Sequence, residues 1–190
     1  MGGTLISLID DLESDFSINI IGACDSKRFL WNSEGIAPSM VQAELKNGER
    51  TEWKNILHRL TNRVSSELIF VDATGSAEVA RLYPAILDAN IHIATPSERA
   101  NTFEQSFYER LQDIVKKNNV EFRYEPTVGA GLPVISTISD LLATGDTIHE
   151  ISGVVSGTMT YLFNELEQGT AFSQAVRTAR ELGYAEPDPR

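Results

Sequence analysis

Short apolar runs alternate along the chain with stretches in which apolar residues recur every three or four positions. The runs predict strands at residues 18–25, 68–72, 91–96 and 120–124, the first two apolar throughout like buried parallel strands. Stretches with helical spacing lie between them, at residues 53–60, 79–87 and 107–115, whereas residues 29–50 form an irregular polar excursion. This alternation predicts an α/β fold with a parallel sheet and right-handed crossovers.

The chain opens with Gly2 and Gly3, followed by apolar residues at helical spacing (Leu5, Ile6, Leu8, Ile9, Leu12). Two glycines at the start of a helix are typical of the end of a dinucleotide-binding loop. The strand and first glycine that precede such a loop are absent, so a flexible N-terminus stays open as the alternative.

The first predicted strand ends in a charged turn, Asp25-Ser26-Lys27-Arg28. An acid at this point of a nucleotide-binding fold can bind the adenosine ribose hydroxyls, whereas Lys27 and Arg28 can bind a 2′-phosphate. A solvated turn is the other interpretation. The pair of cations favours NADP.

A glycine-rich loop at residues 124–133 links the last predicted strand to a helix that starts at Pro133. Gly129 and Gly131 allow close backbone approach. A strand, a glycine-rich turn and a helix start can together hold an ion, a phosphate or a substrate. A tight turn between packed elements is the alternative. Small hydroxylated residues at 73–76 are likewise well placed for a cofactor.

The character of the chain changes after this loop, and we expect a domain boundary near residue 132. Residues 147–155 are strand-like, with Ser152-Gly153 indicating a bulge. One helix is expected from Ser156 to Gly169 and another from Ser173, as its cap, to Gly183. The chain ends in a stiff segment with two prolines and two carboxylates, residues 184–190.

Composition excludes several classes of protein. The formal charge of −11 and the pI near 4.7 argue against a nucleic-acid or membrane-surface partner. No apolar run reaches the ~18 residues that a membrane helix needs, and no signal peptide opens the chain. A single cysteine, Cys24, rules out an internal disulfide and fits a reducing compartment. We expect a cytoplasmic protein.

Three motifs carry a family resemblance. They are residues 125–133 (Glu-Pro-Thr-Val-Gly-Ala-Gly-Leu-Pro), residues 152–158 (Ser-Gly through Ser-Gly-Thr) and residues 183–190 (Gly-Tyr-Ala-Glu-Pro-Asp-Pro-Arg). Together they resemble homoserine dehydrogenase, most closely the dehydrogenase half of bifunctional aspartokinase–homoserine dehydrogenases. The resemblance runs over nearly the whole chain, and the last motif is highly specific.

The resemblance implies a fold and an activity. The expected fold is a Rossmann-like NAD(P)-binding domain at residues 1–132, without its first strand, followed by part of an α+β catalytic and dimerisation domain at residues 133–190. The expected reaction is the NAD(P)H-dependent interconversion of L-aspartate 4-semialdehyde and L-homoserine, on the way to threonine and methionine. Members of the family are homodimers.

The resemblance also implies roles for single residues. Gly2 and Gly3 match the end of the phosphate loop, Thr74 matches a cofactor contact, and Gly183 matches a cofactor or substrate contact. Glu186 matches the carboxylate that holds the amino group of the substrate, a task that suits a group charged at neutral pH.

A monovalent-cation site, with Na⁺ as the ion, is implied at the glycine-rich loop. The matching residues are Glu125, Val128, Ala130 and Leu132. Such a site uses mostly backbone carbonyls, so it depends on the geometry of the loop.

The chain departs from the family in three places. Ser97-Glu98 stands where the family has Asn-Lys, and Arg99 is the cation that could take over the cofactor contact. The family's catalytic lysine matches no residue up to Arg190, and the opening strand is missing. A fragment is therefore expected, and a catalytically inactive remnant that binds nucleotide or a partner subunit stays open. Aspartate-semialdehyde dehydrogenase chemistry is set aside, because it needs a nucleophilic cysteine and Cys24 lies in a buried strand.

Overall fold

The computed structural model describes residues 2–12, 18–62, 67–154 and 156–185. The chain forms two compact units, Met1–Arg123 and Tyr124–Arg190. Each is described by itself. Within the described ranges, no helix combines the length and the apolar character needed to cross a bilayer.

The first unit begins with an antiparallel sheet in the order β1-β2-β3, built from β1 (Ile20–Cys24), β2 (Arg28–Ile36) and β3 (Glu49–Arg50). The prediction of a parallel first strand is therefore wrong. The physical reason is the turn after β1: the Asp25 carboxylate accepts hydrogen bonds from the amides of Lys27 and Arg28, both at 2.7 Å. This local bonding closes a tight hairpin and sends the chain straight back.

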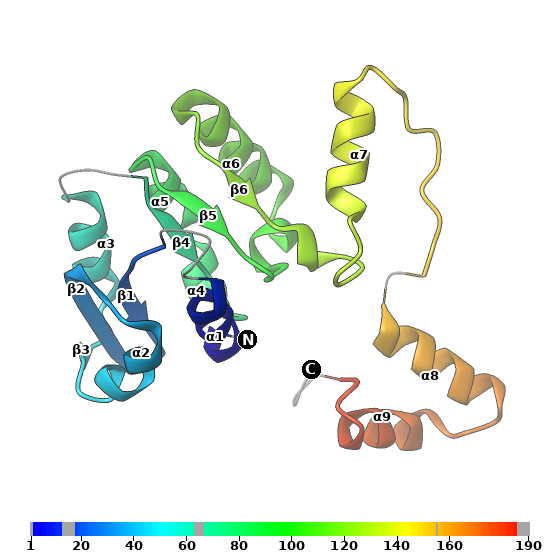
Figure 1. Ribbon diagram of the computed structural model, residues 1–190. Coiled ribbons are helices and arrows are strands. Elements are labelled where there is room, and N and C mark those ends of the chain that lie inside the picture. Colours follow the sequence, from blue (N-terminus) through cyan, green and yellow to red (C-terminus); the bar gives the residue numbers. More distant parts are fainter. Residues whose placement is uncertain (1, 13–17, 63–66, 155, 186–190) are drawn as a thin grey trace. The chain divides into compact units, whose positions relative to one another are not determined.

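The predicted polar excursion at residues 29–50 is also wrong, since it contains most of β2 together with the helix α2 (Pro38–Leu45). Phe29 and Ile36 of β2 and Val41 of α2 are buried. Helix α1 (Gly2–Leu12) packs against α2, and confirms the helical spacing at the N-terminus (Figure 1).

A second sheet in the first unit is parallel, with the order β4-β5-β6. It consists of β4 (Ile69–Val71), β5 (His92–Ala94) and β6 (Phe122–Arg123). The connecting helices are α4 (Ala77–Ala80), α5 (Tyr83–Asp88), the 3₁₀ turn η1 (Arg99–Thr102) and α6 (Gln105–Asn118), while α3 (Trp53–Thr61) precedes β4. The predicted alternation of strands and helices is confirmed here.

One helix was expected at residues 79–87, but the structure has two, α4 and α5. The break falls just before Pro84, which stands in the first turn of α5. Proline has no amide hydrogen to donate to the preceding turn, so it favours a new helix start over a continuation.

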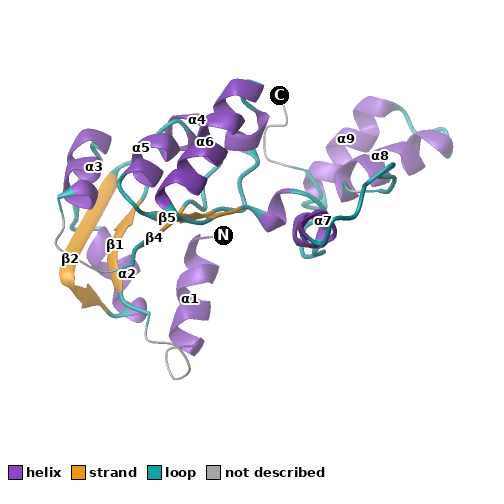
Figure 2. Ribbon diagram, turned by 90° about the horizontal axis from the view of Figure 1, so that it is seen from above, coloured by secondary structure: helices purple, strands orange, loops and turns teal. Residues whose placement is uncertain are grey.

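Among the described residues, helices cover only one face of the parallel sheet. Phe70, Ile93 and Phe122 lie in register on the face where α5 packs against β5, with α6 beside α5 (Figure 2). Ile93 is 1% exposed. On the other face, Ile69 is 62% and Val71 43% exposed. The expectation that this strand is buried on both faces is wrong, because no described helix packs on its second face.

The second unit contains the 3₁₀ turn η2 (Glu125–Thr127) and the helices α7 (Val134–Ala143), α8 (Gly157–Glu167) and α9 (Phe172–Glu181). The helix starts predicted at Pro133 and Ser156 are confirmed, and the Ser156 hydroxyl accepts from the Met159 amide at 3.2 Å. Ser173 is not the cap of α9. Its N-cap is Ala171, so Ser173 already lies inside the helix.

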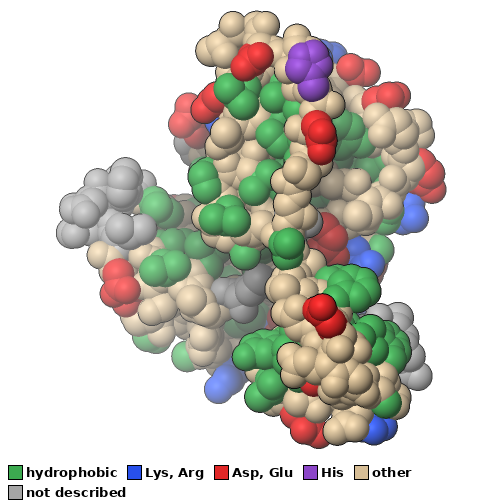
Figure 3. All heavy atoms as spheres, turned by 90° about the vertical axis from the view of Figure 1, so that its right-hand side faces the viewer, with side chains coloured by type: hydrophobic (Ala, Val, Ile, Leu, Met, Phe, Trp, Pro, Cys, Tyr) green, Lys and Arg blue, Asp and Glu red, His purple; other side chains and the backbone are tan. Residues whose placement is uncertain are grey.

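Residues 147–154 form no strand, contrary to expectation. They pair with no neighbouring strand in the described ranges, and a strand needs such a partner for its backbone hydrogen bonds. Helices α8 and α9 pack on each other through the fully buried Ala175 and Ala179. Much apolar surface of the second unit is exposed (Figure 3), including Leu142, Val154 and Phe163.

Candidate functional site

The carboxyl end of β4 is organised by one buried acid, Asp72, which is 2% exposed. Its Oδ1 atom accepts hydrogen bonds from the amide and the hydroxyl of Thr74, each at 2.7 Å. Its Oδ2 atom accepts from the hydroxyl of Tyr83 at 2.7 Å. The Thr74 hydroxyl in turn accepts from the Ser76 amide at 3.2 Å. These bonds fix the shape of the loop at residues 73–76.

The neighbouring strand β5 ends in a second polar loop that is bonded to the first. Thr95, which is 4% exposed, donates its hydroxyl to the Asp72 carbonyl at 2.9 Å and accepts from the Ser97 amide at 2.9 Å. The Ser97 hydroxyl then accepts from the Arg99 amide at 3.4 Å. Both loops lie where the carboxyl ends of parallel strands meet, which is where α/β folds bind their ligands.

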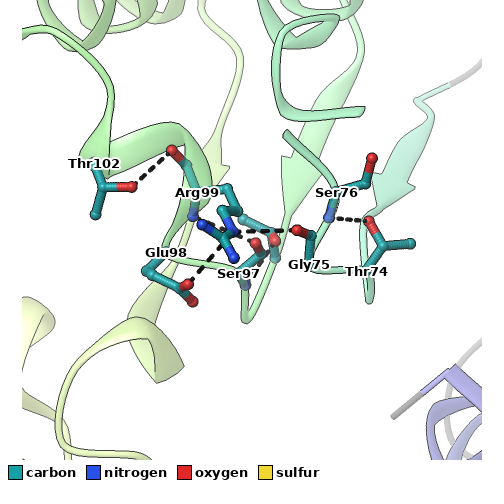
Figure 4. Close-up of polar contacts among 8 residues, drawn as sticks. Thr74, Gly75, Ser76, Ser97, Glu98, Arg99 and Thr102 are labelled. Carbon is teal, nitrogen blue, oxygen red and sulfur yellow. Dashed lines mark hydrogen bonds and ion pairs between the residues drawn. The ribbon is translucent and has the colours of Figure 1, made fainter. Parts of the chain in front are cut away.

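Arg99 connects the two loops directly. Its Nε donates to the Gly75 carbonyl at 3.2 Å and lies 3.8 Å from a carboxylate oxygen of Glu98 (Figure 4). The Arg99 carbonyl accepts from the Thr102 hydroxyl at 3.1 Å. Nη1 and Nη2 of this half-exposed guanidinium contact no acceptor within the described part of the chain, so they can bind an anionic or carbonyl group of a ligand.

The first turn of α1 reaches the same place. A Cβ built on Gly2 would lie 4.0 Å from the Cβ of Ala73, so the amides at the start of α1 lie next to the loop after β4. A Cβ built on Gly75 would meet nothing within 4 Å, which leaves that loop open to close approach. A helix N-terminus beside an open loop suits a phosphate, so these residues fit a dinucleotide.

The charged turn after β1 is held by its own hydrogen bonds. Burial, and then the charges of Asp25 and Asp72, raise the pKa of Cys24 at the end of β1 to about 11. Hydrogen bonds from the Lys27 and Arg28 amides lower the pKa of Asp25, so its carboxylate stays charged. The side chain of Arg28 donates to the Gly48 carbonyl at 3.2 Å. The turn thus presents an acid and two cations together.

The first part of the second unit is the glycine-rich loop. The two carboxylate oxygens of Glu125 accept from the Ile135 amide at 2.9 Å and the Ser136 amide at 2.8 Å. The side chain of Glu125 therefore bonds to free amides in the first turn of α7. Gly129 and Ala130 have left-handed backbones, with φ of 71° and 52°.

The remaining residues expected at the cation site are Val128, Ala130 and Leu132. The Leu132 side chain is 60% exposed, and its carbonyl accepts from the Val134 amide at 2.9 Å. Across the described ranges, no group of three or more His, Cys, Asp or Glu side chains is arranged to hold a metal ion.

A pocket of about 330 Å³ in the second unit is lined by Gly157, Thr158, Tyr161 and Tyr184. The Thr158 hydroxyl donates to the Tyr184 carbonyl, and the two tyrosine rings meet edge to face with centroids 5.2 Å apart. Gly183, with φ of 75°, ends α9 just before Tyr184. Glu186 lies outside the described residues.

The structure therefore brings together Gly2, Thr74 and Arg99. Lys27 and Arg28 lie together at the turn between β1 and β2. Sequence reasoning missed Asp72 and Tyr83, which shape the loops, and Tyr161 of the pocket. An aspartate directly after a buried strand and before Thr-Gly-Ser was the available signal for Asp72.

Comparison with known proteins gives matches over both units. The family model for the homoserine dehydrogenase NAD binding domain matches residues 1–125, and the model for homoserine dehydrogenase matches residues 133–190. The chain is 37% identical to the chloroplastic bifunctional aspartokinase/homoserine dehydrogenase 1 of Arabidopsis thaliana, over all of this chain and 22% of that protein. It is 38% identical to homoserine dehydrogenase of Schizosaccharomyces pombe, over 74% of this chain and 42% of that one.

A solved structure of a hyperthermophilic archaeal homoserine dehydrogenase in complex with NADPH has a TM-score of 0.78 and 24% identity. The alignment covers all of this chain and 60% of the archaeal one, and it shows a shared fold. The chain thus spans less than half the length of the two relatives named above.

Proposed function

The chain belongs to the homoserine dehydrogenase family, and from this premise we propose that it serves the NAD(P)H-dependent interconversion of L-aspartate 4-semialdehyde and L-homoserine. The observation that supports this most strongly is the meeting of three elements at one sheet edge. These are the start of α1, the loop after β4 and the loop after β5. A dinucleotide needs such an arrangement of free amides and open backbone.

In the first unit, different residues bind different parts of the dinucleotide. Gly2 and Gly3 place the first amides of α1 against a phosphate. Thr74 keeps its loop in shape, and Arg99 offers its free Nη atoms to the ligand. A nicotinamide dinucleotide, when bound, supplies the hydride that reduces the aldehyde. Lys27 and Arg28 make NADP the preferred form, because their positive charges attract the negatively charged 2′-phosphate.

The second unit holds the substrate in this proposal. Glu186 binds the ammonium group of the substrate through its charge. Gly183 and the pocket of Thr158, Tyr161 and Tyr184 lie in the same part of the chain and leave room for a small amino acid. The tyrosine hydroxyls and the Thr158 hydroxyl are groups that can hydrogen-bond the substrate's polar atoms.

The glycine-rich loop is proposed to hold a monovalent cation, Na⁺, through backbone carbonyls of Glu125, Val128, Ala130 and Leu132. Backbone carbonyl oxygens are hard ligands that suit such an ion. The carboxylate of Glu125 takes no part, because its two oxygens already bond to the start of α7.

We also propose a cellular compartment, a pathway and an oligomeric state. We place the reaction in the cytoplasmic synthesis of threonine and methionine, and we expect the second unit to pair with that of another copy. Its exposed apolar side chains, such as Val154 at 77% and Phe163 at 60%, are consistent with a covered surface.

A second function is favoured by one observation. Glu98 stands beside Arg99 and partly neutralises it, and Arg99 is bonded to the Gly75 carbonyl. A chain with this arrangement can bind nucleotide, or a partner subunit, without turnover.

The test is the oxidation of NADPH by the purified chain in the presence of aspartate semialdehyde, with NADH in parallel. Saturable turnover supports the dehydrogenase. A folded chain that binds NADPH and shows no turnover supports the second function. A folded chain that binds neither cofactor contradicts the dehydrogenase and the nucleotide-binding form of the second function.

A further inference from the structure

Both proposed cofactor loops are hydrogen-bonded to Asp72. The family resemblance does not include Asp72 among its site residues. Three hydrogen bonds end on its carboxyl group, two from Thr74 and one from Tyr83, all at 2.7 Å. With 2% exposure, the side chain itself is out of reach of a ligand. Asp72 can therefore affect ligand binding only through the residues that it contacts.

The side chain of Asp72 controls the first loop. Thr74 is bonded to it through both amide and hydroxyl, and the same hydroxyl accepts from the Ser76 amide. The backbone of residues 74–76 is therefore fixed by a single buried oxygen atom, Oδ1 of Asp72. Low local dielectric strengthens such a network when every member is satisfied.

The backbone of the same residue controls the second loop. The Asp72 carbonyl accepts from the Thr95 hydroxyl, and that hydroxyl accepts from the Ser97 amide, both at 2.9 Å. Arg99 then closes the connection by donating to the Gly75 carbonyl. The two loops are thus linked twice, through the buried Asp72 and through the exposed hydrogen bond from Arg99 to the Gly75 carbonyl.

Tyr83 ties this anchor to the core. It is fully buried in α5, and its ring meets Phe122 of β6 edge to face with centroids 5.7 Å apart. Burial raises the pKa of the Tyr83 hydroxyl most; the hydrogen bond with Thr95 lowers this pKa and the neighbouring Asp72 raises it, and the net rise keeps the hydroxyl a donor. Tyr83 donates to Oδ2, the oxygen that accepts from neither loop, and its hydroxyl also has a hydrogen bond with the side chain of Thr95.

We propose that Asp72 is a positioning residue for the nicotinamide dinucleotide: it presets the loops at 73–76 and 96–99 in the shape that receives the ligand. The identity of the ligand rests on the proposed function, whereas the holding of the loops does not. A loop fixed before binding does not lose its conformational freedom on binding, and this raises affinity.

Three variants that each remove one hydroxyl separate positioning from plain stability. Thr74→Val removes the hydroxyl that links Asp72 to the Ser76 amide, and Thr95→Val removes the hydroxyl that links the Asp72 carbonyl to the Ser97 amide. Tyr83→Phe removes a bond to the same carboxyl group and leaves the bonds of Thr74 and Thr95 to Asp72 in place. Thr95 is 4% exposed and so has no direct contact to offer a ligand. The full chain is used throughout, with melting temperature recorded for each variant.

In the free protein, amide hydrogen exchange reports the loops. We expect exchange at residues 74–76 to rise about tenfold in Thr74→Val, and exchange at 97–99 to rise about tenfold in Thr95→Val. Tyr83→Phe is expected to leave both loops at the wild-type rate even where its melting temperature falls as far.

NADPH affinity, measured by fluorescence titration, is expected to weaken about tenfold in both threonine variants and less than about twofold in Tyr83→Phe. Asp72→Ala is expected to release the first loop and to weaken affinity at least as much as Thr74→Val, while the second loop keeps its bond to the backbone carbonyl of residue 72. Asp72→Asn, which keeps one oxygen for Thr74, is expected to recover part of the affinity. Wild-type affinity in Thr95→Val would overturn the proposal. So would equal loss of affinity in Tyr83→Phe.

The two proposals fail separately. If the folded wild-type chain binds no NADPH, the proposed function is wrong, and hydrogen exchange alone decides whether Asp72 holds the loops. If the wild-type chain binds NADPH and the threonine variants exchange and bind as it does, the function stands and the positioning role is wrong.

Discussion

At the scale of residues, we propose that Lys27 decides between two cofactors that differ by one phosphate. It follows Asp25, whose carboxylate is held by the turn and can serve the ribose of either cofactor. We expect Lys27→Ala to raise the Kd for NADPH about tenfold and the Kd for NADH less than about twofold, since only NADPH offers a phosphate to the ammonium group.

Lys46→Ala is the matched control, because Lys46 is an exposed lysine at the end of α2. It should leave both constants unchanged in the same fluorescence titration at fixed salt. Equal weakening of NADPH and NADH in Lys27→Ala would show that Lys27 does not read the 2′-phosphate.

Cys24 gives a prediction about pH. Burial, together with the charges of Asp25 and Asp72, raises its pKa from 9.0 to about 11. Only the thiolate reacts with thiol reagents, so at pH 8 the native protein should be labelled about 100-fold more slowly than a thiol with the ordinary pKa. The rate should rise about tenfold per pH unit up to about pH 11. Labelling at pH 8 as fast as in urea would contradict this.

The raised pKa of Cys24 also makes the free energy of unfolding depend on pH. The folded pKa of Cys24 lies above the unfolded value, so the unfolded state loses its proton first as pH rises. The contribution of Cys24 is therefore complete below pH 9 and is lost between pH 9 and about 11. The variant Cys24→Ser should lack this part of the alkaline decline in unfolding free energy, as followed by urea titration.

At the scale of elements, Glu125 holds the start of α7. We expect Glu125→Ala to lower the free energy of unfolding by about 1–2 kcal/mol, because two amides at the helix start lose their acceptor. Glu121→Ala removes only an exposed ion pair with Arg123, at 2.9 Å, and should cost less than about 0.5 kcal/mol. Urea unfolding followed by circular dichroism measures both. Equal effects would mean that the Glu125 bonds contribute nothing to α7.

The parallel sheet offers a matched pair on neighbouring strands. Ile93 is 1% and Ile69 is 62% exposed. Ile93→Ala should lower the unfolding free energy by about 2–4 kcal/mol, since it leaves a cavity under α5, and Ile69→Ala by less than about 1 kcal/mol. Similar losses in urea unfolding would show that the second face of the sheet is covered after all.

The sequence predicts elements well where a local pattern decides them. The helix at α1 and the strand at β5 follow from spacing alone. The strand β2 was missed because Asn32 and Gly35 interrupt its apolar alternation, although Asn32 bonds locally to the Gly35 carbonyl at 2.8 Å. The antiparallel direction of β1 could not be read from its apolar residues, because the Asp25 turn decides it.

In the candidate site, too, the sequence predicted some residues and missed others. Thr74 and Arg99 were predicted from the family resemblance, and Thr74 also from its place among small hydroxylated residues between a strand and a helix. The dependence of both loops on Asp72 could not be predicted, since it needs Tyr83 and Thr95 to arrive from separate elements in three dimensions.

At the scale of the whole molecule, the two units differ in how much they bury. The buried side chains of the described residues belong almost entirely to the first unit, and in the second only Ala175 and Ala179 are buried apolar residues. We accordingly place the proposed ligand site in the first unit. Our central claim is that the start of α1 and the loops after β4 and β5 bind a nicotinamide dinucleotide.

Amide hydrogen exchange of the full chain with and without saturating NADPH tests this claim most directly. We expect slower exchange at residues 2–4, 73–76 and 96–99 when NADPH is present, with no change in α3 as an internal control. Saturable binding that protects none of these segments, or a folded chain that binds no NADPH, would contradict it.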